Sequence, residues 1–140
     1  MRELKRSALV KCAPEAAWAV VSDVLAYPRF VPGCNGAELV RNEGEARVIR
    51  VGVRHGALHS HFTTRNTYEP PHRLSMALVE GPFKALSGHW QITPLGEAGC
   101  QIELTLRYQF SNPLKAAILQ PLFTSVADQM VKAFVQRLQA

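Results

Sequence analysis

Residues 113–140 read PLKAAILQPLFTSVADQMVKAFVQRLQA, and this stretch decides the fold because its apolar residues recur at helical spacing. They form two adjacent rows, Leu114, Ile118, Leu122, Val126, Met130, Phe134 and Leu138 in one, and Leu119, Phe123, Ala127, Val131 and Val135 in the other. The opposite face is polar and carries Lys115, Gln120, Ser125, Asp128, Gln129, Lys132, Gln136 and Arg137. We therefore expect a long helix that lies with one broad apolar face against a curved apolar surface.

Pro121 interrupts this helical pattern. A proline inside a helix lacks the N–H donor and collides with the carbonyl four residues earlier, at a cost of about 3 kcal/mol unless the helix kinks. Two arrangements follow from this. Either the helix kinks at Pro121 and angles residues 113–120 away near a cavity mouth, or two helices are separated by a break near Gln120.

Most of the remaining chain alternates between apolar and polar residues, as strands with one buried face do. The alternation is complete from Cys100 to Phe110. The other expected strands are residues 3–12, 37–41 and 45–54, followed by strands through Leu58, Phe62 and Tyr68, through Leu74, Met76 and Leu78, and through Leu86, Trp90 and Ile92. After the first strand, Pro14 suits the first turn of a helix over residues 14–24, and the prolines of residues 27–34 predict a short helical turn and a loop.

This order of elements predicts an α+β fold of the helix-grip type. Seven antiparallel strands would twist and coil into a concave sheet around the long C-terminal helix, with two short helices after the first strand. A concave sheet and a straight helix do not fill space completely. We therefore expect a cavity between them.

The composition predicts one soluble domain over residues 1–140. The chain is 47% hydrophobic and 19% charged, and a chain of this length can bury about 70% of its unfolded surface in one core. Its longest apolar run is far too short to span a bilayer, and the N-terminal residues lack the apolar region of a secretory signal, so we expect a cytoplasmic protein. Cys12, Cys34 and Cys100 lack the spacing of a zinc site, and we expect reduced, packed thiols.

Eleven of the sixteen cationic residues are arginine, and the formal net charge is +5. Arginine forks suit phosphate groups, so Arg41, Arg47 and Arg50 are candidates for a basic surface that meets RNA or an anionic lipid surface. A merely solvated basic surface is the alternative. We expect no DNA partner.

A catalytic site is not apparent in the sequence. His59 and His61 have the spacing of metal ligands on a strand, but they lie opposite Leu58, Phe62 and Tyr68, so we expect them in solvent. No nucleophile elbow, P-loop or dinucleotide motif occurs. We therefore expect no enzyme activity, no metal site and no catalytic cofactor.

One polar pair is expected to face inward. Thr64 and Asn66 share the parity of Phe62 and Tyr68, whereas Arg65 points outward. Buried polar groups need partners. Asn66 therefore either ties a sheet edge or the loop over residues 27–34 to the core, or contacts a ligand beside a small residue such as Gly88.

Four motifs occur in order along nearly the whole chain: YPRFVPGC (residues 27–34), TTRN (63–66), VEGPFKALSGHWQITPL (79–95) and MVKAF (130–134). Together they resemble the coenzyme Q-binding START-like family, which includes ribosome association toxins of the RatA type and mitochondrial quinone-binding proteins. That family lies within the polyketide cyclase/dehydrase and lipid-transport superfamily. The resemblance implies a helix-grip fold of the START and Bet v 1 type with a hydrophobic cavity.

The resemblance also implies two functions. The first is non-enzymatic binding of an apolar isoprenoid lipid such as ubiquinone, held as a ligand in support of respiration, with the protein cytoplasmic or peripheral to the inner membrane. The ring would lie near Phe30 and Cys34, and the tail near Phe62, Trp90, Leu104, Leu106, Tyr108, Phe123, Met130 and Phe134. The alternative is a RatA-like toxin that binds the large ribosomal subunit and blocks subunit joining. A polyketide cyclase or dehydrase is a third and weaker hypothesis, because no inward acid-base pair is found.

Overall fold

A computed structural model describes residues 1–139 as one antiparallel sheet with helices packed on its inner face. Ala140, which the sequence analysis included in the C-terminal helix, lies outside the described residues. The elements in chain order are β1 (Arg2–Val10), α1 (Pro14–Val21), the 3-10 helix η1 (Val24–Arg29), β2 (Cys34–Asn42), β3 (Ala46–His55), β4 (Leu58–Glu69), β5 (Arg73–Glu80), β6 (Phe83–Pro94), the 3-10 helix η2 (Gly96–Ala98), β7 (Cys100–Phe110) and α2 (Pro113–Gln139).

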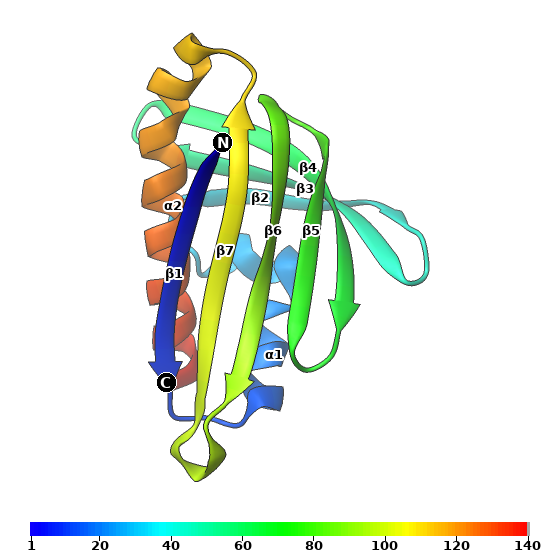
Figure 1. The fold of residues 1–140 in the computed structure, drawn as a ribbon, viewed down its shortest axis with the longest axis vertical. Coiled ribbons are helices and arrows are strands. Elements are labelled where there is room, and N and C mark those ends of the chain that lie inside the picture. The colour runs from blue at the N-terminus through cyan, green and yellow to red at the C-terminus, as the bar shows by residue number, and fades with distance from the viewer. Residues whose placement is uncertain (140) are drawn as a thin grey trace.

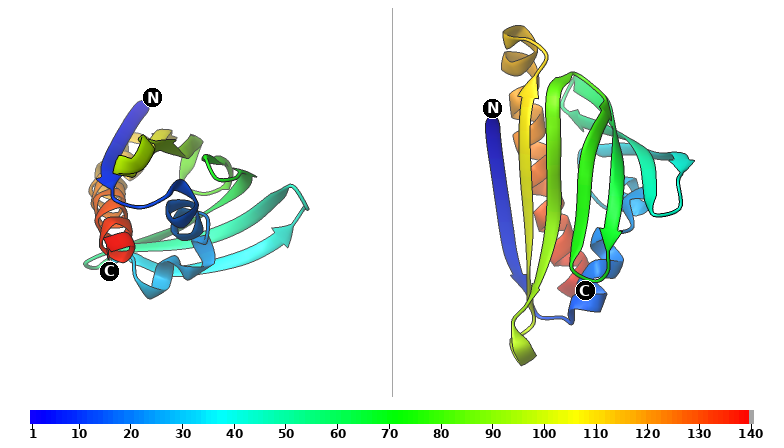
Figure 2. Two further views of the ribbon diagram at one scale, coloured as in Figure 1. Left: turned by 90° about the horizontal axis from the view of Figure 1, so that it is seen from below. Right: turned by 45° about the vertical axis from the view of Figure 1, so that its right-hand side comes forward.

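The seven strands form a single sheet in the order β1-β7-β6-β5-β4-β3-β2, and all neighbours are antiparallel. The sheet curves strongly, so that β1 and β2 come to opposite sides of α2, and α1 lies within the curve (Figures 1 and 2). Helix α2 packs against β1 at one edge of the sheet and against β3, the strand next to the other edge. The predicted helix-grip fold is therefore confirmed.

Helix α2 is continuous from Pro113 to Gln139, so of the two expected arrangements the break near Gln120 is wrong. Pro121 is exposed, and its ring therefore needs no space in the core. The Thr124 hydroxyl donates a hydrogen bond of 3.1 Å to the Gln120 carbonyl oxygen in the same turn of the helix. At the start of the helix, the Lys115 backbone N–H donates to Asn112 Oδ1 over 2.8 Å, so Asn112 caps the N-terminus of α2.

The buried face of α2 is shorter than the sequence pattern predicts. Leu122, Phe123, Val126, Ala127, Ala133 and Phe134 are buried. Leu114 and Ile118, which the pattern assigned to the apolar face, are exposed, because the first turns of α2 extend beyond the ends of the strands (Figure 1). Asp128, assigned to the water face, instead pairs with Arg6 of β1.

Helix α1 ends at Val21 rather than at Val24. The Ser22 N–H and hydroxyl both bond the Trp18 carbonyl oxygen, which closes the helix, and η1 then carries the chain through Pro28. This turn brings Val24 and Tyr27 into the core.

No helix within residues 1–139 is long and apolar enough to cross a membrane. The three cysteines are free thiols, and Cys34 and Cys100 are buried. Burial, followed by the neighbouring Cys12 thiol, raises the pKa of Cys100 to about 11. Cys100 therefore stays protonated near neutral pH.

Candidate ligand-binding cavity

A cavity of about 90 Å³ lies between the inner face of the sheet, η1 and α2. Its wall is almost entirely apolar and consists of Val24, Tyr27, Val51, Val53, Phe62, Thr64, Asn66, Leu74, Met76, Leu86, Gly88, Trp90, Leu104, Leu106, Phe123, Val126, Ala127 and Met130. Because side chains alternate along a strand, residues of one parity on each of β3 to β7 reach this space together.

Gly88 is part of the wall and has a structural reason to be glycine. A Cβ at this position would lie 2.6 Å from the Thr105 carbonyl oxygen and 2.6 Å from Leu106 Cδ2. The neighbouring strand backbone therefore leaves no room for a side chain at residue 88.

Polar groups interrupt the apolar wall on β4. Thr64 and Asn66 are buried, and the Thr64 hydroxyl donates a hydrogen bond of 2.7 Å to Asn66 Oδ1. This bond orients the Asn66 amide so that its NH₂ group is the remaining side-chain donor. Both residues line the cavity, so their predicted inward orientation is confirmed.

Tyr68 continues this polar strip on the same side of β4. Its hydroxyl is buried and has no hydrogen-bond partner within residues 1–139. Burial raises the pKa of Tyr68, while the Arg47 guanidinium, 5.7 Å from the ring centre, lowers it. A buried hydroxyl without a hydrogen-bond partner destabilises the folded protein, and a hydrogen bond to an oxygen or nitrogen atom of a ligand would remove that cost.

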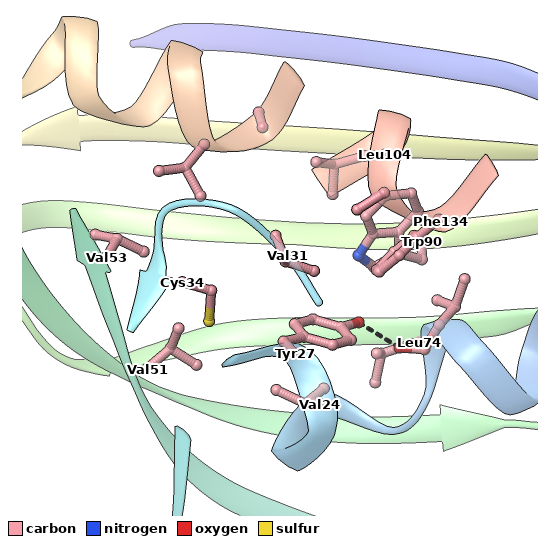
Figure 3. Close-up of a cluster of buried hydrophobic side chains, with 14 of the residues drawn as sticks. Val24, Tyr27, Val31, Cys34, Val51, Val53, Leu74, Trp90, Leu104 and Phe134 are labelled. Carbon is pink, nitrogen blue, oxygen red and sulfur yellow. Dashed lines mark hydrogen bonds between the residues drawn. The ribbon is translucent and has the colours of Figure 1, made fainter. Parts of the chain in front are cut away.

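Tyr27, which belongs to η1, closes one side of the cavity. Its hydroxyl donates to the Val21 carbonyl oxygen, and its ring centre lies 5.2 Å from that of Phe134 (Figure 3). Burial is the main cause that raises the pKa of Tyr27 well above its ordinary value. The tyrosine is therefore a neutral, fixed part of the wall.

The structure brings six of the predicted ligand-contacting residues into the cavity wall: Phe62, Trp90, Leu104, Leu106, Phe123 and Met130. The four others do not line it. Tyr108 accepts a hydrogen bond of 2.7 Å from Gln120 Nε2, and Phe134 packs 5.0 Å from Trp90 behind the wall. Contact of any of these residues with a ligand remains a prediction.

The two residues expected near a ring-bearing head group also lie outside the wall. Phe30 lies under the Arg137 guanidinium, 4.4 Å from its ring centre, in a shallow hollow near the end of α2. Cys34 is buried beside the start of β2, its thiol is 3.8 Å from the Gly36 carbonyl oxygen, and burial raises its pKa. The polar groups that do line the cavity belong to β4.

Sequence reasoning missed several wall residues, among them Val24, Tyr27, Met76, Leu86, Val126 and Ala127. Strand parity identified Met76 and Leu86 as inward, but it could not distinguish a cavity wall from a filled core. Val24 and Tyr27 carried no periodic signal, although Tyr27 begins the motif over residues 27–34, because irregular segments have no periodicity that assigns a face.

The three candidate basic residues do not share one face. Arg41 and Arg50 are exposed on the outer face of the sheet, and Arg41 pairs with Glu43 at 3.0 Å. Arg47 is opposite Asn66 in the strand register and reaches over the Tyr68 ring, so it belongs to the inner face. The prediction of a single basic surface formed by all three residues is therefore wrong, because successive side chains of β3 point to opposite faces of the sheet and separate Arg47 from Arg50.

His59 and His61 are exposed, as predicted from their parity. Within residues 1–139, no three His, Cys, Asp or Glu side chains gather in a group that could hold a metal ion. The wall residues named above include neither a carboxylate nor an imidazole. What the cavity offers chemically is an apolar container with an amide donor and a hydroxyl on one wall.

A concave sheet that encloses an apolar cavity against a long helix defines a class of small-molecule binding folds. Residues 10–135 match the family described as polyketide cyclase/dehydrase and lipid transport. The chain is 40% identical over 134 residues to the ribosome association toxin RatA of Pseudomonas aeruginosa, covering 96% of this chain and 93% of the relative. It is 25% identical to the mitochondrial coenzyme Q-binding protein COQ10 of Drosophila melanogaster, covering 94% of this chain and 56% of that protein.

The fold is also that of a solved aromatase/cyclase. The Zhui aromatase/cyclase from a Streptomyces species superimposes with a TM-score of 0.86 at 18% identity, covering 99% of this chain and 93% of that structure. At this identity the likeness shows the fold alone. The chain belongs to the polyketide cyclase/dehydrase and lipid transport family, and its relatives in that family include both RatA and COQ10 proteins.

Proposed function

We propose that this protein binds an apolar ligand that carries an oxygen-bearing ring, of the isoprenoid quinone class, in the cavity between sheet and α2. The observation that carries this proposal is the polar pair of Thr64 and Asn66 in an otherwise apolar wall, with the unpartnered hydroxyl of Tyr68 two residues further along β4. Quinone carbonyl and methoxy oxygens accept hydrogen bonds, which the Asn66 NH₂ group can donate. The similarity to a coenzyme Q-binding protein supports the same ligand class.

The cavity volume decides which part of such a ligand it takes. A buried water needs about 10–15 Å³, and pockets for whole drug-sized ligands span about 300–1,000 Å³. The cavity, at about 90 Å³, is between these sizes. It therefore fits a ring or a single isoprene unit, and a longer tail has to leave the cavity or separate α2 from the sheet.

The test combines extraction and binding. The protein is purified from a quinone-making host, bound lipid is identified by mass spectrometry, and binding of added ubiquinone is followed by quenching of tryptophan fluorescence, to which Trp18 and Trp90 both contribute. Loss of one buried hydrogen bond predicts that Asn66→Leu weakens binding about tenfold. The matched control is Asn35→Leu, which changes an exposed asparagine. Absence of both extracted quinone and ubiquinone binding would refute the proposal.

A second function, association with the large ribosomal subunit, is favoured by the 40% identity to a RatA protein along nearly the whole chain. Its candidate surface is the outer face of β2 and β3, where Arg50 is exposed and has no ion pair within the described chain. The two functions involve different surfaces, so one protein can have both. Neither requires catalysis by the chain.

Sedimentation with purified large subunits tests this second function. Arg41→Glu and Arg50→Glu should weaken co-sedimentation, and raising the salt concentration should do the same, because phosphate contacts release counterions. Arg137→Glu, which lies near the end of α2, is the charge-matched control. Wild-type protein that does not sediment with the subunits would exclude the function.

A further inference from the structure

One end of the molecule exposes large aliphatic side chains. This end is formed by the start of α2, residues 113–118, and by the turn between β5 and β6. The Ser111 N–H, just before α2, donates a hydrogen bond of 3.0 Å to the Pro82 carbonyl oxygen in that turn. We call this end the tip. Leu114 and Ile118 are four residues apart on one face of α2 and are 69% and 44% exposed. The first turns of α2 lie beyond the strand ends, so the sheet does not cover them (Figure 1).

Cationic side chains surround these aliphatic residues. Arg2 and Lys84 line one hollow of the tip together with Pro113, and Lys115 lines another together with Arg50 and Pro82. All four cations are exposed, and none of them has an ion pair within residues 1–139. The acidic side chain that lines the same hollows is Glu80. The tip is therefore both apolar and positively charged.

We propose that the tip is a docking surface for an anionic lipid bilayer. Exposed aliphatic side chains gain free energy when they enter the acyl boundary, and lysine and arginine side chains beside them are attracted to lipid phosphates. RNA would use the cations but would offer no apolar environment to Leu114 and Ile118. The combination of the two residue types therefore favours a membrane surface.

The tip adjoins the cavity through a layer of aromatic rings. Phe110 and Tyr108 line a hollow of the tip, whereas Phe123 lines the cavity. The ring centre of Phe123 is 5.5 Å from that of Phe110 and 5.0 Å from that of Phe83. If the proposed quinone binding holds, a lipid-soluble ligand would reach the cavity from this end. The docking itself does not depend on that function.

Co-sedimentation of the full chain with quinone-free vesicles tests the docking. Vesicles of phosphatidylcholine are compared with vesicles of phosphatidylcholine and phosphatidylglycerol. The double variant Leu114→Ser, Ile118→Ser should lose at least tenfold in vesicle affinity. Each cation near an anionic bilayer contributes roughly fivefold to the affinity. The double variant Lys84→Glu, Lys115→Glu should therefore lose more than about fivefold for each of the two positions, because each change also adds a negative charge. All four positions are exposed, so the folded state should persist, which thermal unfolding checks.

Matched controls change the same residue types elsewhere. Leu9→Ser with Val40→Ser removes aliphatic side chains that are 68% and 54% exposed, and Lys11→Glu with Lys132→Glu reverses two exposed charges. These controls should bind vesicles like the wild type. Failure of the wild type to bind anionic vesicles, or equal binding by the tip variants, would overturn the proposal.

Two other occupants of the tip have their own signatures. If the tip charge reversals abolished sedimentation with large ribosomal subunits and left vesicle binding unchanged, the tip would be an RNA surface. If the Leu114→Ser, Ile118→Ser variant converted a dimer to a monomer in lipid-free solution and left vesicle binding unchanged, the tip would be a self-association surface. Either result would overturn membrane docking.

Discussion

The Thr64 hydroxyl donates a hydrogen bond to Asn66 Oδ1 over 2.7 Å, two residues along the inner face of β4. Because both side chains are buried in the cavity wall, this bond satisfies two polar groups at once and orients the Asn66 amide.

Thr64→Val should destabilise the protein by about 1–2 kcal/mol, because Asn66 Oδ1 then loses its donor in a buried site. The free energy of unfolding in urea measures this. Thr67→Val, on the exposed side of β4, is the control and should be close to neutral. Equal stability of both variants would show that the bond contributes nothing.

Gly88→Ala should cost about 1–3 kcal/mol, because the new Cβ has to displace the β7 backbone near Thr105 and the Leu106 side chain. Gly36→Ala is the matched control, since a Cβ there meets no atom within 4 Å. The midpoints of urea unfolding compare the two. A Gly88→Ala protein as stable as the control would contradict the close packing of β6 on β7.

The stability of the protein should fall above pH 10 partly because of Tyr27. Burial raises the folded-state pKa of Tyr27 well above its ordinary value of 10.0, so in this range the unfolded state loses the proton while the folded state keeps it. Since the folded state then binds more protons, the free energy of unfolding decreases as the pH rises.

Tyr27→Phe should remove that contribution and flatten the dependence of stability on pH between about 9 and 11. At neutral pH the same variant should be less stable by about 1 kcal/mol, because the hydroxyl no longer donates to the Val21 carbonyl oxygen. Urea unfolding over a series of pH values measures both effects. An unchanged slope would mean that Tyr27 ionises in the folded protein as it does when unfolded.

Asn112→Ala should destabilise the first turn of α2 by about 1 kcal/mol, because the Lys115 N–H loses its side-chain acceptor. Amide hydrogen exchange of residues 114–118 should accelerate more than that of residues 126–134, which pack against the sheet. Asn35→Ala is the control at an exposed position outside any helix. Uniform protection along α2 in the variant would refute the local effect.

The fold could be predicted well because its elements have strong periodicity. Alternation identified β7 from Cys100 to Phe110, and the two apolar rows identified α2. The same parity placed Thr64 and Asn66 inward and His59 outward, which the structure confirms. These properties depend on neighbouring residues in one element, so the sequence carries them directly.

The candidate site was predictable only in part. Six of the expected residues line the cavity, but Phe30, Cys34, Tyr108 and Phe134 do not. Periodicity indicates which residues of one element lie on the same face. It does not indicate how far a side chain reaches across the core or what fills the space opposite. Tyr27 therefore lines the wall although no periodicity assigned its side chain to a face.

By itself the sequence determined the order and type of the elements, the inward polar pair on β4 and the family, because these follow from local pattern and motif. Only the tertiary structure decided that the cavity is about 90 Å³, that Arg6 pairs with Asp128 across β1 and α2, and that Leu114 and Ile118 remain exposed. Each of these depends on the distance between elements far apart in the chain. Such distances are set by the curvature of the sheet and by the packing of the whole core against α2.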